Sequence, residues 1–309
     1  MPGKDDNLAL LDPYFVGKLR RLDLIARLVV EGFITGLHKS PYHGFSVEFA
    51  EHRPYMPGDP IHAVDWKVYA KSDRFYIKEY EEETNLRCHL LLDASSSMAY
   101  RSDPKYLTKL DYGTYLAAAL AYLMIRQQDA VGLLTFDDDV RRFIPARSAG
   151  THLRVLLGEL SRLSRAARQE PAGRSTRIGR SLHHLADRLT RRGLVVLISD
   201  LMDAPEEVLK GLQHFRHRKH EVVVLHLLDP AEVAFPFQEE TIFVDMESGR
   251  KLSTIPWEYA KEYRRAVESW QNRYRRVCAE QSIDYVEVRT DTPYDVALLR
   301  YIEKRKRLH

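Results

Sequence analysis

The sequence is poor in cysteine and contains no long apolar run. Its two cysteines, Cys88 and Cys278, lie far apart without the close spacing of a metal site, which fits two structural thiols in a reducing compartment. No apolar run reaches the roughly 18 residues that a membrane span needs, and the first residues do not combine a basic start with an apolar stretch. We therefore expect a cytoplasmic protein with no membrane span and no signal peptide.

The sequence also lacks the usual patterns of catalytic and nucleotide-binding sites. It has no glycine-rich phosphate loop, and its 13 histidines form no metal-binding pattern. A nucleophile would need an adjacent base, and neither His nor Lys accompanies Ser95 and Ser97 in their motif. We therefore predict that the chain is not an enzyme, and keep a metal-dependent hydrolase as the alternative.

Positive charge is unevenly spread along the chain. The net charge is only +3, but the stretch 141–192 holds thirteen arginines against three acidic residues, and an acidic cluster at 79–83 precedes it. Such asymmetry attracts acidic partners, although a solvated helical face explains it equally well. Nucleic-acid binding is disfavoured because Phe143 is the only aromatic residue in the stretch, and stacking platforms are therefore missing.

Short apolar strands alternate with helices from residue 86 onward, which indicates a mostly parallel α/β sheet covered by helices on both faces. The 309 residues suit one large domain with an attachment, or two domains. We divide the chain into an N-terminal helix and small β-rich module at 1–85 and an α/β domain at 86–309. The predicted strands are 87–92, 130–136, 140–146, 194–199, 221–228, 241–246 and 283–290; the predicted helices are 8–37, 108–128, 151–164, 178–191, one after Pro205, 257–280 and 293–305.

Oxygen-bearing side chains follow two of these strands. Ligand sites in such sheets lie beyond the carboxyl ends of the strands, where Asp93, Ser95 and Ser97 form a D-x-S-x-S loop and Asp200 closes the strand 194–199. Thr176, before the helix at 178–191, adds a third hydroxyl or caps that helix. Hard cations such as Mg²⁺ require oxygen ligands, and neutral hydroxyls leave positive charge on the ion that attracts an outside carboxylate. The alternative is a turn of Asp and Ser that caps a helix without metal.

These residues resemble the metal-ion-dependent adhesion site of von Willebrand factor A domains. The resemblance implies a doubly wound, mostly parallel sheet and a divalent cation, Mg²⁺ with Mn²⁺ or Ca²⁺ as alternatives. Two positions depart from the family pattern: Ser199-Asp200-Leu201 replaces the common Thr-Asp-Gly, and the surroundings of Thr176 match the usual G-x-T pattern only loosely. The ligands that the resemblance implies are Asp93, Ser95, Ser97, Thr176 and Asp200.

A larger part of the chain resembles the bacterial domain-of-unknown-function 58 family. The stretches that carry the resemblance are 44–49, 53–59 and 64–67, followed by the acidic cluster and the D-x-S-x-S loop. Members of that family are often encoded beside MoxR-type AAA+ ATPases and are thought to act as their partners or adaptors in protein maturation. The resemblance therefore implies a metal-dependent protein-binding module whose partner supplies an Asp or Glu to the ion.

Overall fold

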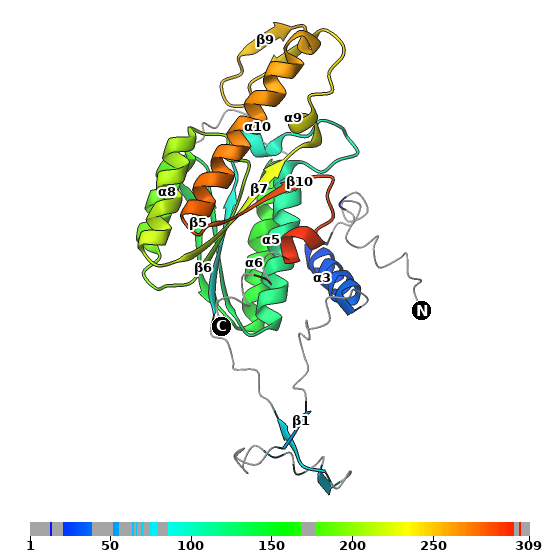
Figure 1. Cartoon of the computed structure of the whole chain (residues 1–309), viewed down its shortest axis with the longest axis vertical. Helices are drawn as coiled ribbons and strands as arrows, with labels where there is room; N and C mark the ends of the chain where they lie inside the picture. Colours follow the sequence, from blue (N-terminus) through cyan, green and yellow to red (C-terminus); the bar gives the residue numbers. More distant parts are fainter. Residues whose placement is uncertain are drawn as a thin grey trace.

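A six-stranded sheet forms the centre of the computed structural model (Figure 1). The structure describes residues 21–38, 86–167 and 177–299, with shorter pieces between 52 and 78 and single residues at 13 and 303. The strand order is β10-β7-β6-β3-β4-β5, and neighbours are parallel except for the antiparallel edge pair β4 and β5. The strands are β3 (Arg87–Asp93), β4 (Ala130–Phe136), β5 (Val140–Arg147), β6 (Leu194–Ser199), β7 (Glu221–Leu228) and β10 (Asp284–Arg289).

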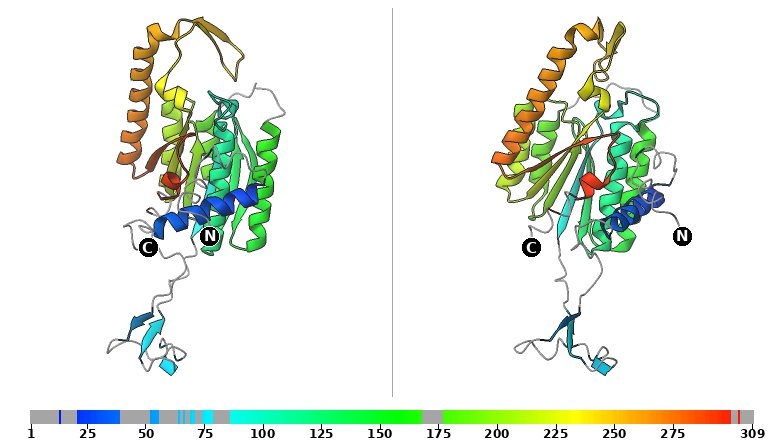
Figure 2. Two further views of the ribbon diagram at one scale, coloured as in Figure 1. Left: turned by 90° about the vertical axis from the view of Figure 1, so that its right-hand side faces the viewer. Right: turned by 45° about the vertical axis from the view of Figure 1, so that its right-hand side comes forward.

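Helices cover both faces of this sheet. The buried apolar residues fall into two clusters, one shared by the sheet with α3 (Leu22–His38), α5 (Lys109–Arg126) and α6 (Gly150–Ala167). The other cluster joins the sheet to α7 (Ile178–Arg188), α8 (Pro205–His217) and α10 (Pro256–Glu280). Figure 2 shows these two helical layers on either side of the strands.

The alternation of side chains along the buried central strands makes both faces of the sheet apolar. All six residues of β6 are buried, and successive side chains of a strand point to opposite faces. Val196 and Ile198 accordingly belong to the cluster with α5, whereas Val195 and Leu197 belong to the cluster with α8. A parallel sheet covered on both faces therefore requires the continuous apolar run that the sequence shows here.

The predicted fold class is confirmed, and the predicted strands 87–92, 130–136, 194–199 and 221–228 match β3, β4, β6 and β7 closely. The N-terminal helix, as far as the structure describes it, is α3, and its apolar side packs into the core of the large domain beside α5. Residues 39–51 of the predicted β-rich module lie outside the described residues. Within the β-rich module predicted at 1–85, β1 (His52–Pro54) pairs antiparallel with β2 (Tyr76–Lys78).

One predicted strand does not join the central sheet. Residues 241–246 contain β8 (Thr241–Val244), which pairs antiparallel with β9 (Lys251–Thr254) in a hairpin of its own. This hairpin follows the short helix α9 (Pro230–Ala234) and, with the start of α10, forms a projection at one end of the molecule (Figure 1). Within the described part of the chain, no helix is long and apolar enough to cross a membrane.

Candidate metal centre

The loop after β3 brings three of the predicted ligands together. Asp93 is the last residue of β3 and is completely buried. Its Oδ1 accepts a hydrogen bond from the Ser95 backbone N–H (2.9 Å), and its Oδ2 accepts one from the Ser199 hydroxyl (2.6 Å). The Ser95 and Ser97 hydroxyl oxygens lie 3.1 Å apart. The D-x-S-x-S spacing therefore aims a carboxylate and two hydroxyls at one small region, as the sequence predicts.

Asp200 reaches the same region from the neighbouring strand. β6 lies beside β3 in parallel register, and Asp200 follows its last residue and is completely buried. Its carbonyl oxygen lies 3.0 Å from Nε2 of the buried His226. Burial, and then the nearby negative charge of Asp200, raise the pKa of Asp93 to about 7. Two buried carboxylates thus stand at the ends of neighbouring parallel strands, an arrangement that a cation between them would stabilise.

The sequence analysis missed a third charged group in this place, Lys109. Its side chain is completely buried, and its Nζ lies 2.8 Å from Oδ2 of Asp200 and 2.5 Å from Oε1 of Glu232. Burial lowers the pKa of Lys109, but the charges of Asp200 and Glu232 outweigh it, so the pKa is raised overall. Lys109 is therefore a buried ammonium ion shared by two carboxylates.

The local sequence places Lys109 at the entrance of α5. Thr108 is the N-cap, and its hydroxyl accepts a hydrogen bond from the Asp111 backbone N–H (3.0 Å). Lys109 is the first residue of an otherwise largely apolar helix that is buried along most of its length. A lysine in such a helix is a signal for a buried partner, because a fully buried lysine is rare unless it is paired.

A capping box fixes Glu232 beside Lys109. Asp229 is the N-cap of α9, and its backbone N–H donates to Oε2 of Glu232 (2.7 Å). The Asp229 side chain in turn accepts a hydrogen bond from the Glu232 backbone N–H, and its Oδ1 also accepts one from the Ala231 backbone N–H (2.8 Å). Oδ2 of Asp229 also accepts from the backbone N–H of Ser102, in the loop that leads from the serine motif to α5 (3.0 Å). The start of the projection is thus held against the candidate metal centre.

Thr176, the fifth predicted ligand, lies outside the described residues, and its role stays a prediction. The helix that follows it, α7, begins at Ile178. The backbone N–H of Gly179 donates to Oδ2 of Asp203 (3.3 Å), three residues beyond Asp200. This contact brings the first turn of α7 close to the segment that follows Asp200.

The donor atoms of this centre fit a hard divalent cation. They comprise the two carboxylates of Asp93 and Asp200 and the two serine hydroxyls, all of them oxygens as Mg²⁺ prefers. Oδ2 of Asp200 is buried and has no hydrogen bond of good geometry among the described residues, although the Lys109 ammonium is near. Over the described ranges no group of three or more His, Cys, Asp or Glu side chains is placed to hold a metal ion. The serine hydroxyls are therefore an essential part of the candidate centre.

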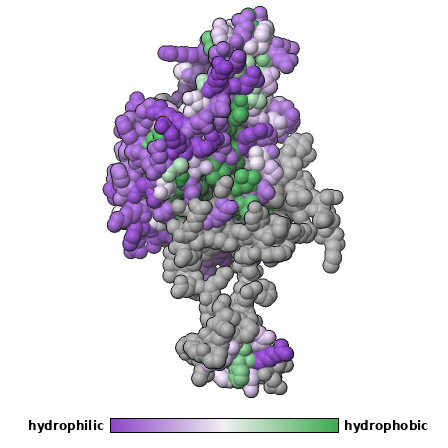
Figure 3. All heavy atoms as spheres, in the orientation of Figure 1, coloured by the Kyte–Doolittle hydropathy of each residue, from purple (hydrophilic) through white to green (hydrophobic). Residues whose placement is uncertain are grey.

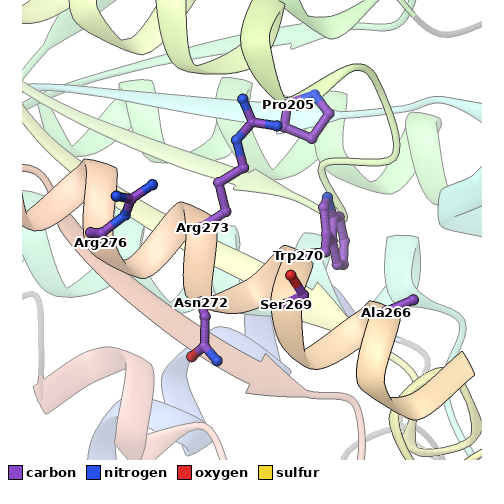
Figure 4. Close-up of a pocket in the computed structure, with 7 residues that line it drawn as sticks. All are labelled: Pro205, Ala266, Ser269, Trp270, Asn272, Arg273 and Arg276. Atoms are coloured by element: carbon purple, nitrogen blue, oxygen red, sulfur yellow. The ribbon is translucent and has the colours of Figure 1, made fainter. Parts of the chain in front are cut away.

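A separate pocket lies between α10 and the start of α8 (Figure 4). Its volume is about 630 Å³. Trp270 stands edge-on against His226, with ring centroids 4.8 Å apart, and His226 in turn contacts the Asp200 carbonyl. The pocket is therefore separated from the candidate metal centre by the His226 ring. Its lining residues are Pro205, Ala266, Ser269, Trp270, Asn272, Arg273 and Arg276.

Several arginines of the basic stretch form ion pairs with the acidic residues available to them. Arg141 pairs with Asp137, and Arg162 pairs with Glu159 at 2.5 Å. Figure 3 shows one described face, with hydrophilic side chains over α8 and apolar side chains gathered towards the middle of the body. The local pairs reduce the positive field that a count of charges along the sequence suggests.

The fold and the site together define a class. The sheet is doubly wound and mostly parallel, a D-x-S-x-S loop follows its central strand β3, and an Asp follows the neighbouring strand β6. This arrangement is similar to that of von Willebrand factor A domains. The family model described as "Protein of unknown function DUF58" matches residues 51–276, and the chain belongs to that family.

The chain is also similar to several other bacterial proteins and to solved structures. "Uncharacterized protein Rv1480" of Mycobacterium tuberculosis and "Uncharacterized protein Mb1516" of Mycobacterium bovis are each 26% identical over 298 residues, covering 96% of this chain and 91% of theirs. The structure of "conserved hypothetical protein BatB" from Bacteroides thetaiotaomicron is 18% identical with a TM-score of 0.45, covering 72% of this chain and 99% of that one. The "SpRpn10 VWA domain" is 9% identical with a TM-score of 0.37, covering 71% and 95% of the two chains.

Proposed function

We propose that the protein is a metal-ion-dependent protein-binding module. Asp93, Ser95 and Ser97 hold a divalent cation, Mg²⁺ with Mn²⁺ or Ca²⁺ as alternatives, and Thr176 and Asp200 complete the set. The observation that supports this proposal most is the meeting of the Asp93 carboxylate with the Ser95 and Ser97 hydroxyls beside the buried Asp200. The cap alternative is disfavoured because Ser95, at the N-cap of the short helix Ser96–Ala99, makes no capping hydrogen bond with its side chain.

The charges of the centre favour binding of an acidic group. Asp93 supplies one negative charge, the serine hydroxyls supply none, and the charge of Asp200 is already offset by Lys109. A divalent ion held there keeps net positive charge and an affinity for a further oxygen ligand. A partner Asp or Glu is therefore the ligand of choice. In this proposal the ion coordinates a carboxylate of the partner protein, and the chain performs no catalysis of its own.

The partner that we propose is a MoxR-type AAA+ ATPase. The chain belongs to the DUF58 family, and the resemblance to that family implies such an ATPase as the partner. The protein then acts in the cytoplasm as an adaptor in the maturation or assembly of other proteins.

Pull-down from a lysate of the native cells tests the proposal. Wild type, Asp93→Ala and Asp103→Ala are each used as bait with Mg²⁺ and with EDTA. Asp103 is a matched control because it is an exposed aspartate of the following loop that pairs with Lys105 at 3.1 Å. We expect the ATPase only with wild type and Asp103→Ala in Mg²⁺. Recovery of the same proteins under all six conditions would overturn the metal-dependent mechanism.

A further inference from the structure

The Lys109 side chain contacts two separate parts of the molecule. One of its ion-pair partners, Asp200, is a predicted metal ligand; the other, Glu232, belongs to the capping box of α9. The two carboxylates come from parts of the chain that follow different strands, β6 and β7. One buried ammonium thus links the metal centre to the base of the projection.

We propose that Lys109 is a built-in competitor of the metal ion for Asp200, and that entry of the ion shifts the pairing of Lys109 towards Glu232. This inference rests on the proposed metal site. Lys109 is a positioning residue in this account, since it does not bind the ion. It acts on the ion only through the Asp200 carboxylate, which attracts both the ammonium and the ion.

The competition follows from elementary electrostatics. The ammonium and the divalent ion carry charges of the same sign, and in a buried place their repulsion is screened far less than in water. Lys109 therefore weakens metal binding, and it keeps Asp200 from neutralising a bound ion. Glu232 offsets the charge of Lys109 and gives the ammonium a second partner, so it favours metal binding. The two residues act on the ion with opposite signs.

The pairing of Lys109 with Glu232 also connects Lys109 to the projection formed by β8, β9 and the start of α10. The Tyr263 hydroxyl, from α10, donates to the Glu232 carbonyl oxygen (3.0 Å). Tyr263 stacks on Phe235 at the end of α9, with centroids 4.1 Å apart, and Phe235 stacks on Phe243 of β8. A chain of contacts thus runs from Lys109 through Glu232 to the hairpin, which Figures 1 and 2 show standing at the end of the sheet where α9 lies. Metal binding that strengthens the Lys109–Glu232 pair steadies this projection.

Titration with Mn²⁺ alone, followed by the electron paramagnetic resonance signal of the free ion, tests the inference. We expect Lys109→Met to bind Mn²⁺ at least tenfold more tightly than wild type. Lys105→Met is the matched control and should leave the affinity unchanged, because Lys105 is an exposed lysine in the loop before α5 and is paired with Asp103. Equal or weaker binding by Lys109→Met would overturn the competition.

A double-mutant cycle separates the action of Glu232 through Lys109 from a direct effect of its charge. Glu232→Gln should weaken Mn²⁺ binding at least threefold in the wild-type background and less than twofold in the Lys109→Met background. An equal effect in both backgrounds would show that Glu232 acts independently of Lys109 and would refute the shift in pairing.

A second readout covers the case in which Lys109→Met fails to fold. Mn²⁺ should slow amide hydrogen exchange across residues 230–244 of wild type and leave it unchanged in Glu232→Gln; equal protection in both refutes the inference. The metal site and the competition are also distinguishable. If neither wild type nor Lys109→Met binds Mn²⁺, both proposals fail, whereas binding with equal affinity removes only the role of Lys109.

Discussion

The Lys109 ammonium lies 2.8 Å from the Asp200 carboxylate, and both side chains are completely buried. These two residues join the first turn of α5 to the carboxyl end of β6. A buried ion pair of this kind adds little stability over a well-packed apolar pair, but removal of one partner leaves a charge stranded away from water. The pair therefore makes the fold sensitive to changes at the candidate metal centre.

Asp200→Asn should lower the free energy of unfolding by about 3 kcal/mol in the absence of metal. Lys109 keeps Glu232 as a partner, so the loss falls at the lower end of the range for a broken buried pair. Urea unfolding with EDTA present measures it. The exposed Asp103→Asn serves as the control and should unfold as wild type does; equal stability of both variants would contradict the account.

Ser199→Ala should lower the free energy of unfolding by about 2 kcal/mol and weaken Mn²⁺ binding. The Ser199 hydroxyl donates to Oδ2 of Asp93 and accepts from the Leu201 backbone N–H (3.0 Å). The substitution thus strands two buried polar groups and frees the Asp93 side chain to move. Calorimetric titration and urea unfolding check the two effects, with the exposed Ser253→Ala as control. Wild-type metal affinity in Ser199→Ala would show that Asp93 needs no such support.

The central part of the fold was predictable because its signals are local. β6 and β7 are apolar runs long enough for one strand each, and the Asp93 loop carries its ligands within five residues. The pairing of Lys109 with Glu232 was not predictable, because 123 residues separate them. The apolar helix that follows Lys109 signals a buried partner for it, but nothing local in the sequence identifies Glu232 of α9 as that partner.

The strand predicted at 241–246 is confirmed as β8, but its pairing in a separate hairpin was not predictable for a related reason. Residues 241–246 have the β-branched and aromatic character of a strand, and a short apolar run does not reveal which sheet it joins. The structure pairs it locally and leaves Ile242, Val244 and Leu252 exposed. Its inner contacts are aromatic, from Phe243 to Phe235 and Phe237. The contacts that fix a projection of this kind arise only when α9 and α10 are in place.

Acid should destabilise the protein in part through His89. Burial, then the charges of His220 and Arg87, lower the pKa of His89 to about 4 from 6.5. The unfolded chain therefore binds more protons between these values, so stability is complete above the unfolded pKa and falls as the pH falls towards the folded one. From about pH 7 to about pH 5, wild type should lose about 2 kcal/mol more than His89→Leu. Parallel urea unfolding curves at the two pH values measure the difference, and an identical pH dependence would contradict this assignment.

Gly179→Ala should destabilise the protein by about 2 kcal/mol. A Cβ at this position would lie 2.7 Å from the backbone carbonyl carbon of Glu207, so α7 and α8 would have to separate beside the Asp200 segment. Gly158→Ala is the matched control, because a Cβ there meets nothing within 4 Å in the middle of α6. That change should stabilise the protein by about 0.5–1 kcal/mol. Thermal unfolding of both variants tests the opposite signs; a shift in the same direction for both would contradict the close approach.

The central claim is that a divalent ion sits on the Asp93 loop. Crystals of the whole chain soaked in Mn²⁺, with data collected at the manganese edge, test it most directly. The account predicts an anomalous peak within about 2.5 Å of the Asp93 carboxylate and the Ser95 and Ser97 hydroxyls, and no such peak in Asp93→Ala. An empty loop in soaked wild-type crystals, with Lys109 still bound to Asp200, would contradict it.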